Sequence, residues 1–378
     1  MRLAAPWLDA PAARAVCGML TEAGHQAWFV GGCVRNALLG VPVSDLDLTT
    51  DARPERVTEL ARAAGLRAVP TGIDHGTVTV IAEGEPFEIT TFRRDVETDG
   101  RHATVAFADS LDEDARRRDF TMNAIYAAPD GTLADPVGGI ADARAGRVRF
   151  IGEPAARIAE DYLRILRFFR FFAWYGDPAL GIDAEGLAAC ADGVEGIETL
   201  SAERIGQEMR KLLAAPNPAP AVASMAACGA LLRVLPGAAP HGLAVLVHVE
   251  EAASLAPDWM RRLAMLGGDT DRLRLSNAEE RVQALLRSDP MPPAETGYRL
   301  GRDRAIDRLA IEATAWGAEL SPDWIAAADR GASQRFPLEA ADLMPALQGP
   351  ALGEALRAAE ARWIASDFTL TRAQLADL

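Results

Sequence analysis

The spacing of apolar residues changes near residue 150 of this 378-residue chain. Before that point, short apolar runs bounded by turns predict strands at residues 27–30, 46–49, 77–82, 87–91, 105–108 and 125–127. Two intervening stretches predict helices over 33–39 and 54–64. After that point, helical periodicity predicts helices over 160–172, 201–213, 220–232, 277–288 and 303–316. We therefore expect a multidomain chain in which an α+β domain, with a mixed sheet and helices, precedes all-α domains.

The chain is too long for one compact core. Residues 214–220, which are rich in proline, and residues 267–271, which hold two glycines and two aspartates, are candidate breaks between helical units. Together with the change near residue 150, they divide the chain into four expected domains, at residues 1–150, 151–215, 216–270 and 271–378.

The net charge of −15 and the isoelectric point near 4.9 bear on the choice of partner. Acidity alone argues against a nucleic-acid partner, because phosphate binding needs basic side chains. Nucleic-acid binding depends on the local electrostatic field rather than on the net charge, however, and basic residues can gather on one face. All 39 basic residues except Lys211 are arginines, which suit bidentate contacts with phosphates and base edges.

The sequence indicates no membrane-spanning helix, signal peptide, zinc site or disulfide. No run of about 20 strongly apolar residues predicts a membrane-spanning helix, and the start of the chain lacks the pattern of a signal peptide. The four cysteines form no CxxC pair, so we expect buried free thiols rather than a zinc site or disulfides. We expect a cytoplasmic protein without a membrane partner.

The first candidate site begins where an apolar strand runs into Gly31 and Gly32 and a helix follows. Glycine lets a phosphate approach the backbone closely, and the N-terminus of a helix offers free N–H groups. Arg35 lies within the first turn of this helix and is placed to reach the same phosphate. The segment therefore predicts a phosphate cradle.

A pair of acidic residues, Asp45 and Asp47, follows after a short loop. Residues two apart on a strand point to the same side, so we expect the two carboxylates to lie close together. Mg²⁺ suits such a pair, with substrate phosphates completing its octahedron. Two such ions would hold an attacking 3′-hydroxyl and a leaving pyrophosphate in line. An isolated pair would be interpreted as a surface turn, but the neighbouring glycine turn favours an active site.

The segment GGCVRNALLGVPVSDLDLTT, residues 31–50, resembles the signature of the polymerase β-type nucleotidyltransferase superfamily. More narrowly, it is similar to the class II tRNA nucleotidyltransferase and bacterial poly(A) polymerase family. One departure is Asn36, where the family usually has an aspartate. The resemblance implies a catalytic head at 1–150, a neck that recognises bases at 151–215, a helical body at 216–270 and a tRNA-binding tail at 271–378.

A second segment, RRDFTMNA at residues 117–124, resembles another motif of this family. The resemblance implies that Arg118, Asp119 and Asn123 lie beside the ribose and phosphates of the nucleotide. A carboxylate at Asp119 would accept from a ribose hydroxyl and so favour ribonucleotides. Without the resemblance, the three consecutive arginines would be interpreted as a solvated basic turn.

A third segment, EDYLRILR at residues 160–167, falls on a predicted helix, where Asp161 and Arg164 share a face, as do Arg164 and Arg167. The plain interpretation is a surface ion pair. The resemblance to the family's EDxxR motif implies instead that Asp161 and Arg164 hydrogen-bond the Watson–Crick edges of CTP and ATP, and we count Arg167 with them. A carboxylate accepts from the exocyclic amine that cytosine and adenine share, and uracil and guanine lack it there.

Four further sequence features indicate residues in or next to the candidate site. Glu88 lies on a predicted strand and is either a third active-site carboxylate or a surface acid. The polar stretch between Arg93 and Thr104 matches the position of the family's flexible loop, and residues 135–139 resemble its hinge. Ser201 is a predicted helix N-cap in a segment that braces the base-reading helix in the family.

The expected function is template-independent addition of CCA to tRNA 3′ ends from CTP and ATP, with Mg²⁺ as cofactor. A CC-adding or A-adding enzyme is an alternative, and the retained loop disfavours the CC-adding one. Poly(A) polymerase is a further alternative, disfavoured because residues 71–78 lack that group's basic segment. An RNA-binding module with a dead active site is disfavoured because Asp45 and Asp47 are both present.

Overall fold

The computed structural model describes residues 1–72, 76–99, 102–344 and 346–376. These residues form two compact units. The first contains Met1–Leu212 and Pro220–Val234, and the second contains Leu213–Ala219 and Leu235–Leu378. Each unit has its own buried core and is described by itself.

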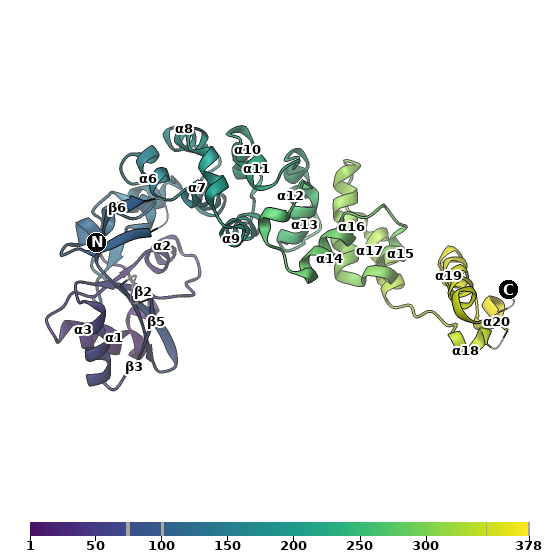
Figure 1. The fold of residues 1–378 in the computed structure, drawn as a ribbon, viewed down its shortest axis with the longest axis horizontal. Coiled ribbons are helices and arrows are strands. Elements are labelled where there is room, and N and C mark those ends of the chain that lie inside the picture. The colour runs from purple at the N-terminus through teal and green to yellow at the C-terminus, as the bar shows by residue number, and fades with distance from the viewer. Residues whose placement is uncertain (73–75, 100–101, 345, 377–378) are drawn as a thin grey trace. The chain divides into compact units, whose positions relative to one another are not determined.

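A mixed seven-stranded sheet forms the framework of the first unit (Figure 1). The strand order is β3-β4-β5-β2-β1-β8-β9, and β2 and β5 run parallel while the other neighbours are antiparallel. Its strands are β1 (Trp28–Val30), β2 (Asp47–Thr50), β3 (Arg67–Gly72), β4 (Thr77–Ala82), β5 (Glu85–Thr91), β8 (Tyr126–Ala127) and β9 (Leu133–Ala134). The predicted mixed sheet followed by helical domains is confirmed.

Short helices surround this sheet and continue beyond it. In the first unit they are α1 (Pro11–Thr21), α2 (Gly32–Leu39), α3 (Pro54–Ala63), α4 (Leu111–Arg116), α5 (Gly139–Arg144), α6 (Pro154–Glu160), α7 (Leu163–Tyr175), α8 (Ala184–Asp192), α9 (Ala202–Leu213), α10 (Ala219–Ala227) and α11 (Ala230–Val234). Short 3₁₀ turns include η3 (Thr121–Asn123) and η4 (Val194–Thr199). The predicted helix over 220–232 is wrong in one respect, since Gly229 adopts φ +82° and separates α10 from α11.

The stretch expected to be a flexible loop forms a separate two-stranded hairpin of β6 (Arg93–Asp99) and β7 (His102–Phe107). Gly100 and Arg101 of this stretch lie outside the described residues, as do residues 73–75 of the segment compared with poly(A) polymerases. Neither β3 nor β6 was predicted, because both carry charged or proline residues that weaken the strand pattern.

The predicted helix over 160–172 is also broken. Helix α6 ends at Glu160, and Asp161 follows in an extended conformation with φ −157° and ψ 104°. The ring of Tyr162 then lies directly against Gly196 of η4, where a Cβ atom would stand 2.0 Å from the ring. Helix α7 begins only at Leu163, because this local packing overrides the helical periodicity of the sequence.

An aromatic cluster joins α7 to the segment with the RRDFTMNA motif. The Phe120 ring centroid lies 4.9 Å from that of Phe150 and 5.0 Å from that of Phe171, and the Phe150 ring stacks on Phe168 at 5.2 Å. Phe120 and Phe168 are fully buried. These contacts fix one end of the predicted nucleotide motif against the neck helix.

The second unit is helical throughout its described residues. Its α-helices are α12 (His241–Ala252), α13 (Trp259–Leu266), α14 (Asn277–Leu286), α15 (Pro293–Leu300), α16 (Arg302–Ala315), α17 (Pro322–Ala332), α18 (Ala340–Leu343), α19 (Gly349–Ala365) and α20 (Arg372–Ala376). Among the described residues of both units, no helix has the length and apolar content needed to cross a membrane.

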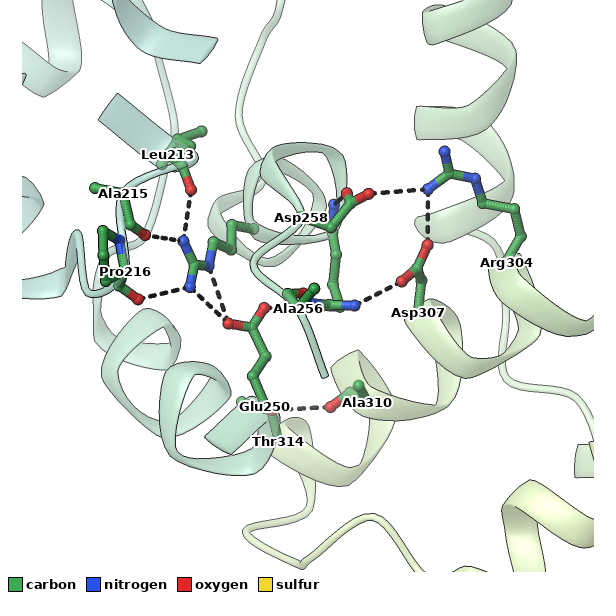
Figure 2. Close-up of polar contacts among 12 residues, drawn as sticks. Leu213, Ala215, Pro216, Glu250, Ala256, Asp258, Arg304, Asp307, Ala310 and Thr314 are labelled. Atoms are coloured by element: carbon green, nitrogen blue, oxygen red, sulfur yellow. Dashed lines mark hydrogen bonds and ion pairs between the residues drawn. The ribbon is translucent and has the colours of Figure 1, made fainter. Parts of the chain in front are cut away.

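Buried charges organise the inside of this unit. The guanidinium of Arg262, 1% exposed, donates to the Leu213 and Pro216 carbonyl oxygens at 2.7 and 2.9 Å and to the Glu250 carboxylate at 2.8 Å. Figure 2 shows these acceptors and the neighbouring pair of Arg304 and Asp307. The buried carboxylate of Glu250 is therefore fully compensated, as burial of a charge requires.

The four cysteines are free. Cys17, Cys33 and Cys190 are buried and Cys228 is half-buried, which confirms the expectation of structural thiols. Burial raises the pKa of the Cys17 thiol to about 12 and that of Cys33 to about 11, so neither is a thiolate at neutral pH.

A contact between α2 and α7 yields a test of the head–neck packing. We expect Tyr175→Phe to remove the 2.7 Å hydrogen bond from Arg35 Nη2 while keeping the ring, which lies 4.0 Å from the guanidinium carbon. A hydrogen bond to a charged group contributes about 1.5 kcal/mol or more, so amide exchange in α2 should accelerate about tenfold. Hydrogen–deuterium exchange with mass spectrometry measures this directly.

The matched control is Tyr298→Phe, which removes a 2.7 Å hydrogen bond to Glu360 in the second unit. It should accelerate exchange around α15 and leave α2 unchanged. Unaltered exchange in α2 of the Tyr175→Phe variant would show that the phenol does not hold the two helices together.

Candidate active site

The turn between β1 and α2 forms the floor of the site. Gly31 is the N-cap of α2 with φ 73° and ψ −123°, a conformation that favours glycine. No side chain caps this helix end, so the first-turn N–H groups have no capping partner from a side chain at Gly31. A helix start of this kind suits an anion, and the phosphate cradle at Gly31 and Gly32 stays a prediction.

Two guanidinium groups flank this turn. A Cβ atom at Gly31 would lie 3.9 Å from Arg118 Nη1, and one at Gly32 would lie 3.9 Å from Arg35 Nη2. Both arginines are largely buried. The helix N-terminus and the two guanidinium groups thus lie at one corner of the sheet, which is an arrangement suited to phosphate.

Carboxylates lie on the strand next to the turn. Asp47 opens β2, which pairs with β1, and stands directly opposite Glu88 of the parallel strand β5. Residues paired in this way point to the same face. Asp45 is not on the strand as predicted but in the exposed loop before it, where its Oδ2 accepts from Ser44 Oγ at 2.8 Å.

Asp47 lies close enough to Glu88 and Asp45 for their negative charges to act on it. Burial, then the charge of Glu88 and to a smaller extent that of Asp45, raises the pKa of Asp47 above its ordinary value, although Arg118 opposes the shift. A bound cation would relieve this crowding. No three His, Cys, Asp or Glu side chains within the described residues form a complete metal site on their own.

Four of the predicted nucleotide-binding residues form one hydrogen-bonded chain. Arg35 Nη1 donates to Asn123 Oδ1, and Asn123 Nδ2 donates to Asp119 Oδ1 at 2.9 Å. Arg167 Nε donates to Asp119 Oδ2 at 2.7 Å. The chain runs from α2 through η3 to α7, and Arg170 and Glu208 extend it to α9 with an ion pair.

This chain changes the roles expected of Arg35 and Asp119. Arg35 is 6% exposed, and its donors are directed to Asn123, Asn36 and Tyr175 rather than outward. Both oxygens of Asp119 accept from protein groups, so the prediction that it accepts from a ribose hydroxyl does not match this geometry. Burial alone would raise the pKa of Asp119, but Arg167 and these hydrogen bonds hold it below its ordinary value.

The hydrogen bonds of Asn36 show what an amide does at this position, where the family usually has an aspartate. Its Oδ1 accepts from Arg35 Nη2 at 2.9 Å, as a carboxylate would. Its Nδ2 donates to the Pro42 carbonyl oxygen at 3.0 Å, which a carboxylate cannot do. The amide therefore ties α2 to the loop that carries Asp45.

Of the predicted base-reading residues, Asp161 lies in the break between α6 and α7, and Arg164 and Arg167 lie on α7. Asp161 Oδ2 accepts from Arg204 Nη2 of α9 at 2.7 Å. Arg164 Nη1 donates to the Arg157 carbonyl oxygen at 2.6 Å and forms an ion pair with Glu160. Asp161 and Arg164 thus do not share a helical face, because Asp161 lies outside both helices.

Ser201 acts as the predicted N-cap, since its Oγ accepts from the Arg204 N–H at 3.4 Å. Two buried residues of the site were missed. Asp114 holds Arg117 and Arg118, and Tyr126 donates to Asp114 at 3.0 Å. Asp114 precedes the two arginines by three and four residues, and this spacing in the sequence indicates ion pairs along one helical face.

Two protein families match this chain. Residues 27–149 match the family described as the Poly A polymerase head domain, which covers the sheet and both acidic strands. Residues 180–241 match the family described as a probable RNA and SrmB-binding site of polymerase A.

Similar proteins cover most of the chain. It is 35% identical over 332 residues to CCA tRNA nucleotidyltransferase 1, mitochondrial, of Mus musculus, which spans 80% of this chain and 73% of the relative. It is 32% identical to the CCA-adding enzyme of Limosilactobacillus fermentum, over 91% of this chain and 90% of that protein. The crystal structure of the Bacillus stearothermophilus CCA-adding enzyme in complex with CTP has a TM-score of 0.75 at 30% identity, covering 96% of this chain and 94% of that one. The chain therefore belongs to the family of class II CCA-adding enzymes and poly(A) polymerases.

Proposed function

We propose that this protein is a tRNA nucleotidyltransferase that adds CCA to tRNA 3′ ends from CTP and ATP. The observation that carries the proposal is the convergence of the cradle at Gly31 and Gly32, the guanidinium of Arg118 and the carboxylates of Asp47 and Glu88 at one corner of the sheet. The relatives named as CCA-adding enzymes support the choice of reaction. We place the activity in the cytoplasm.

The transfer step replaces a phosphoanhydride bond of the nucleotide with a phosphodiester bond, and the attacking 3′-hydroxyl releases its proton to water. The 3′-oxygen of the tRNA forms a bond to the α-phosphorus of the nucleotide, the bond to the bridging oxygen of the β-phosphate breaks, and pyrophosphate leaves. The N–H groups at the start of α2 and the guanidinium of Arg118 bind the phosphates and balance their charge. Arg35, buried behind the cradle, adds positive charge without facing outward.

Nucleotidyltransferases of this family depend on a divalent metal ion. In this chain Asp45 and Asp47 would hold Mg²⁺, with Glu88 as a further carboxylate. The bound ion supplies Lewis-acid charge at the reacting phosphate. Asp119, Asn123 and Arg167 keep the neck helix α7 tied to η3 beside the cradle.

We assign the selection of the incoming base to residues at the α6–α7 break. The ion pair between Asp161 and Arg204 is 34% and 47% exposed at the two side chains, and such a pair contributes only about 0–1 kcal/mol. Asp161 can therefore exchange Arg204 for the exocyclic amine of cytosine or adenine at little cost. Arg164 follows three residues later in α7 and would exchange its contacts with Glu160 and the Arg157 carbonyl oxygen to donate to the ring acceptors of the same bases.

The reaction is tested with purified protein, Mg²⁺ and tRNA transcripts that end before CCA, after C or after CC. We expect CTP incorporation on the first two and ATP incorporation on the third. ATP use on the CC end alone would indicate an A-adding enzyme, CTP use alone a CC-adding one, and long A tails on unrelated RNA a poly(A) polymerase. No incorporation of either nucleotide would refute the proposal.

The carboxylate at the start of β2 is expected to be essential. Asp47→Asn should lower kcat by at least about a thousandfold, since metal stabilisation of the transition state amounts to several kcal/mol. Asp51→Asn is the matched control, because Asp51 follows the other end of the same strand and accepts there from the Gln26 N–H at 2.7 Å. Comparable loss in both variants would show a folding defect rather than a catalytic role.

Substitution at the α6–α7 break should change which nucleotides are accepted. Asp161→Ala should reduce discrimination against UTP and GTP by about tenfold or more, because the hydrogen bond that distinguishes the bases is lost. The ratio of kcat/KM values for CTP and UTP on a tRNA lacking CCA measures this effect. Asp192→Ala, at the exposed end of α8, is the control and should keep wild-type selectivity. Unchanged selectivity in Asp161→Ala would argue against base reading at this position.

A further inference from the structure

A buried carboxylate lies behind the phosphate cradle and was not among the predicted site residues. Asp114 sits in α4 and is 0% exposed. The motif residues Arg117 and Arg118 follow it by three and four positions, and both guanidinium groups turn back toward it. A charge buried this deeply is retained only when its hydrogen bonds are satisfied.

The two oxygens of Asp114 divide their partners between two segments. Oδ1 accepts from Arg117 Nε at 2.8 Å and from the Arg93 backbone N–H at 3.4 Å. Oδ2 accepts from Arg118 Nε at 3.2 Å, Arg118 Nη2 at 3.0 Å and the Tyr126 hydroxyl at 3.0 Å. Burial opposes the charge, but the two arginines outweigh it and hold the pKa of Asp114 at about 2.

These bonds fix the direction of Arg118. With Nε and Nη2 committed to Asp114, the remaining nitrogen, Nη1, is the one that lies near Gly31. Tyr126 supports the same geometry, because its hydroxyl also accepts from Arg118 Nε at 3.1 Å. A planar guanidinium held at two nitrogens has little rotational freedom left, so Nη1 is presented to the cradle in one orientation.

Backbone contacts hold the same segment from the neck side. Arg157 Nη2 donates to the carbonyl oxygens of Arg117 and Arg118, the latter at 3.2 Å, and Arg164 Nη2 reaches the Arg117 carbonyl at 3.5 Å. The side chains are thus fixed by Asp114 and the backbone by α6 and α7. The Arg93 N–H, at the base of the β6–β7 hairpin, connects the hairpin to Asp114 by donating to its Oδ1.

We propose that Asp114 is a positioning residue for the nucleotide, which acts through Arg118 by holding its guanidinium against the Gly31 turn. This inference rests on the proposed nucleotidyl transfer and deepens it by assigning affinity for the triphosphate to a residue that does not touch it. Asp114 preorganises the cation, so its loss weakens nucleotide binding even where the fold persists.

The test is the KM for CTP of Asp114→Asn at saturating tRNA. Asparagine keeps the shape but places an amide donor against a guanidinium donor, which frees Arg118. We expect the KM to rise about tenfold or more, as for loss of a charged hydrogen bond, with a smaller change in kcat. Tyr126→Phe, which removes only the hydroxyl, should raise the KM about threefold and keeps the proposal testable if Asp114→Asn does not fold.

Glu250→Gln is the matched control. Glu250 is 2% exposed and accepts from two arginines, as Asp114 does, but lies in the second unit (Figure 2). It should lower thermal stability and leave the KM for CTP within about twofold of wild type. An equal rise in KM for Glu250→Gln would assign the effect to general loosening and overturn the proposal.

A double-mutant cycle with Arg118→Ala separates positioning from a structural role. If Asp114 acts through Arg118, Asp114→Asn should add less than about twofold to the KM in the Arg118→Ala background. The same factor in both backgrounds, or a wild-type KM in Asp114→Asn, would overturn the proposal. Wild-type protein that incorporates no nucleotide would instead refute the proposed function, so the two failures are distinguishable.

Discussion

The first unit depends on one buried carboxylate, that of Asp119. It accepts from the Phe120 N–H, from Asn123 and from Arg167, and so joins the segment after α4 to the neck helix α7. Removing it would leave the partly buried Arg167 with only the more distant Glu208 as an ion-pair partner and Asn123 Nδ2 without its acceptor. Since the Asn123 carbonyl oxygen lies beside Gly31, this contact links the turn before α2 to helix α7.

An acidic chain can still bind a nucleotide, because some of its acidic side chains form ion pairs with arginines inside each unit. Much of the negative charge is used inside each unit, where Asp114 and Glu250 each hold two arginines. At the cradle, Arg118 pairs with Asp114 through Nε and Nη2 and keeps Nη1 near the Gly31 turn. Arg35 lies behind the turn with the neutral partners Asn123, Asn36 and Tyr175. The net charge of −15 therefore says little about the field that a phosphate meets there.

Sequence reasoning succeeded where a local rule was sufficient. Strand β4 was predicted at its observed bounds and α2 to within one residue, since period-two and helical patterns dominate there. It failed where packing between segments decided the geometry. The break at Asp161 follows from Tyr162 packing on Gly196, and the inward turn of Arg35 follows from Tyr175 of a helix far along the chain.

The sequence by itself determined the chemistry of the site. Two glycines before a helix, a DxD segment and the RRDFTMNA motif specify phosphate binding and a divalent cation, because those functions need particular residue types at short spacing. The tertiary structure decided which of these side chains face the cradle and which support it. Asp119 pairs with Arg167 from a distant segment, since a charge removed from water must find its partner wherever the fold places one, whereas Asp114 pairs with the arginines three and four residues after it.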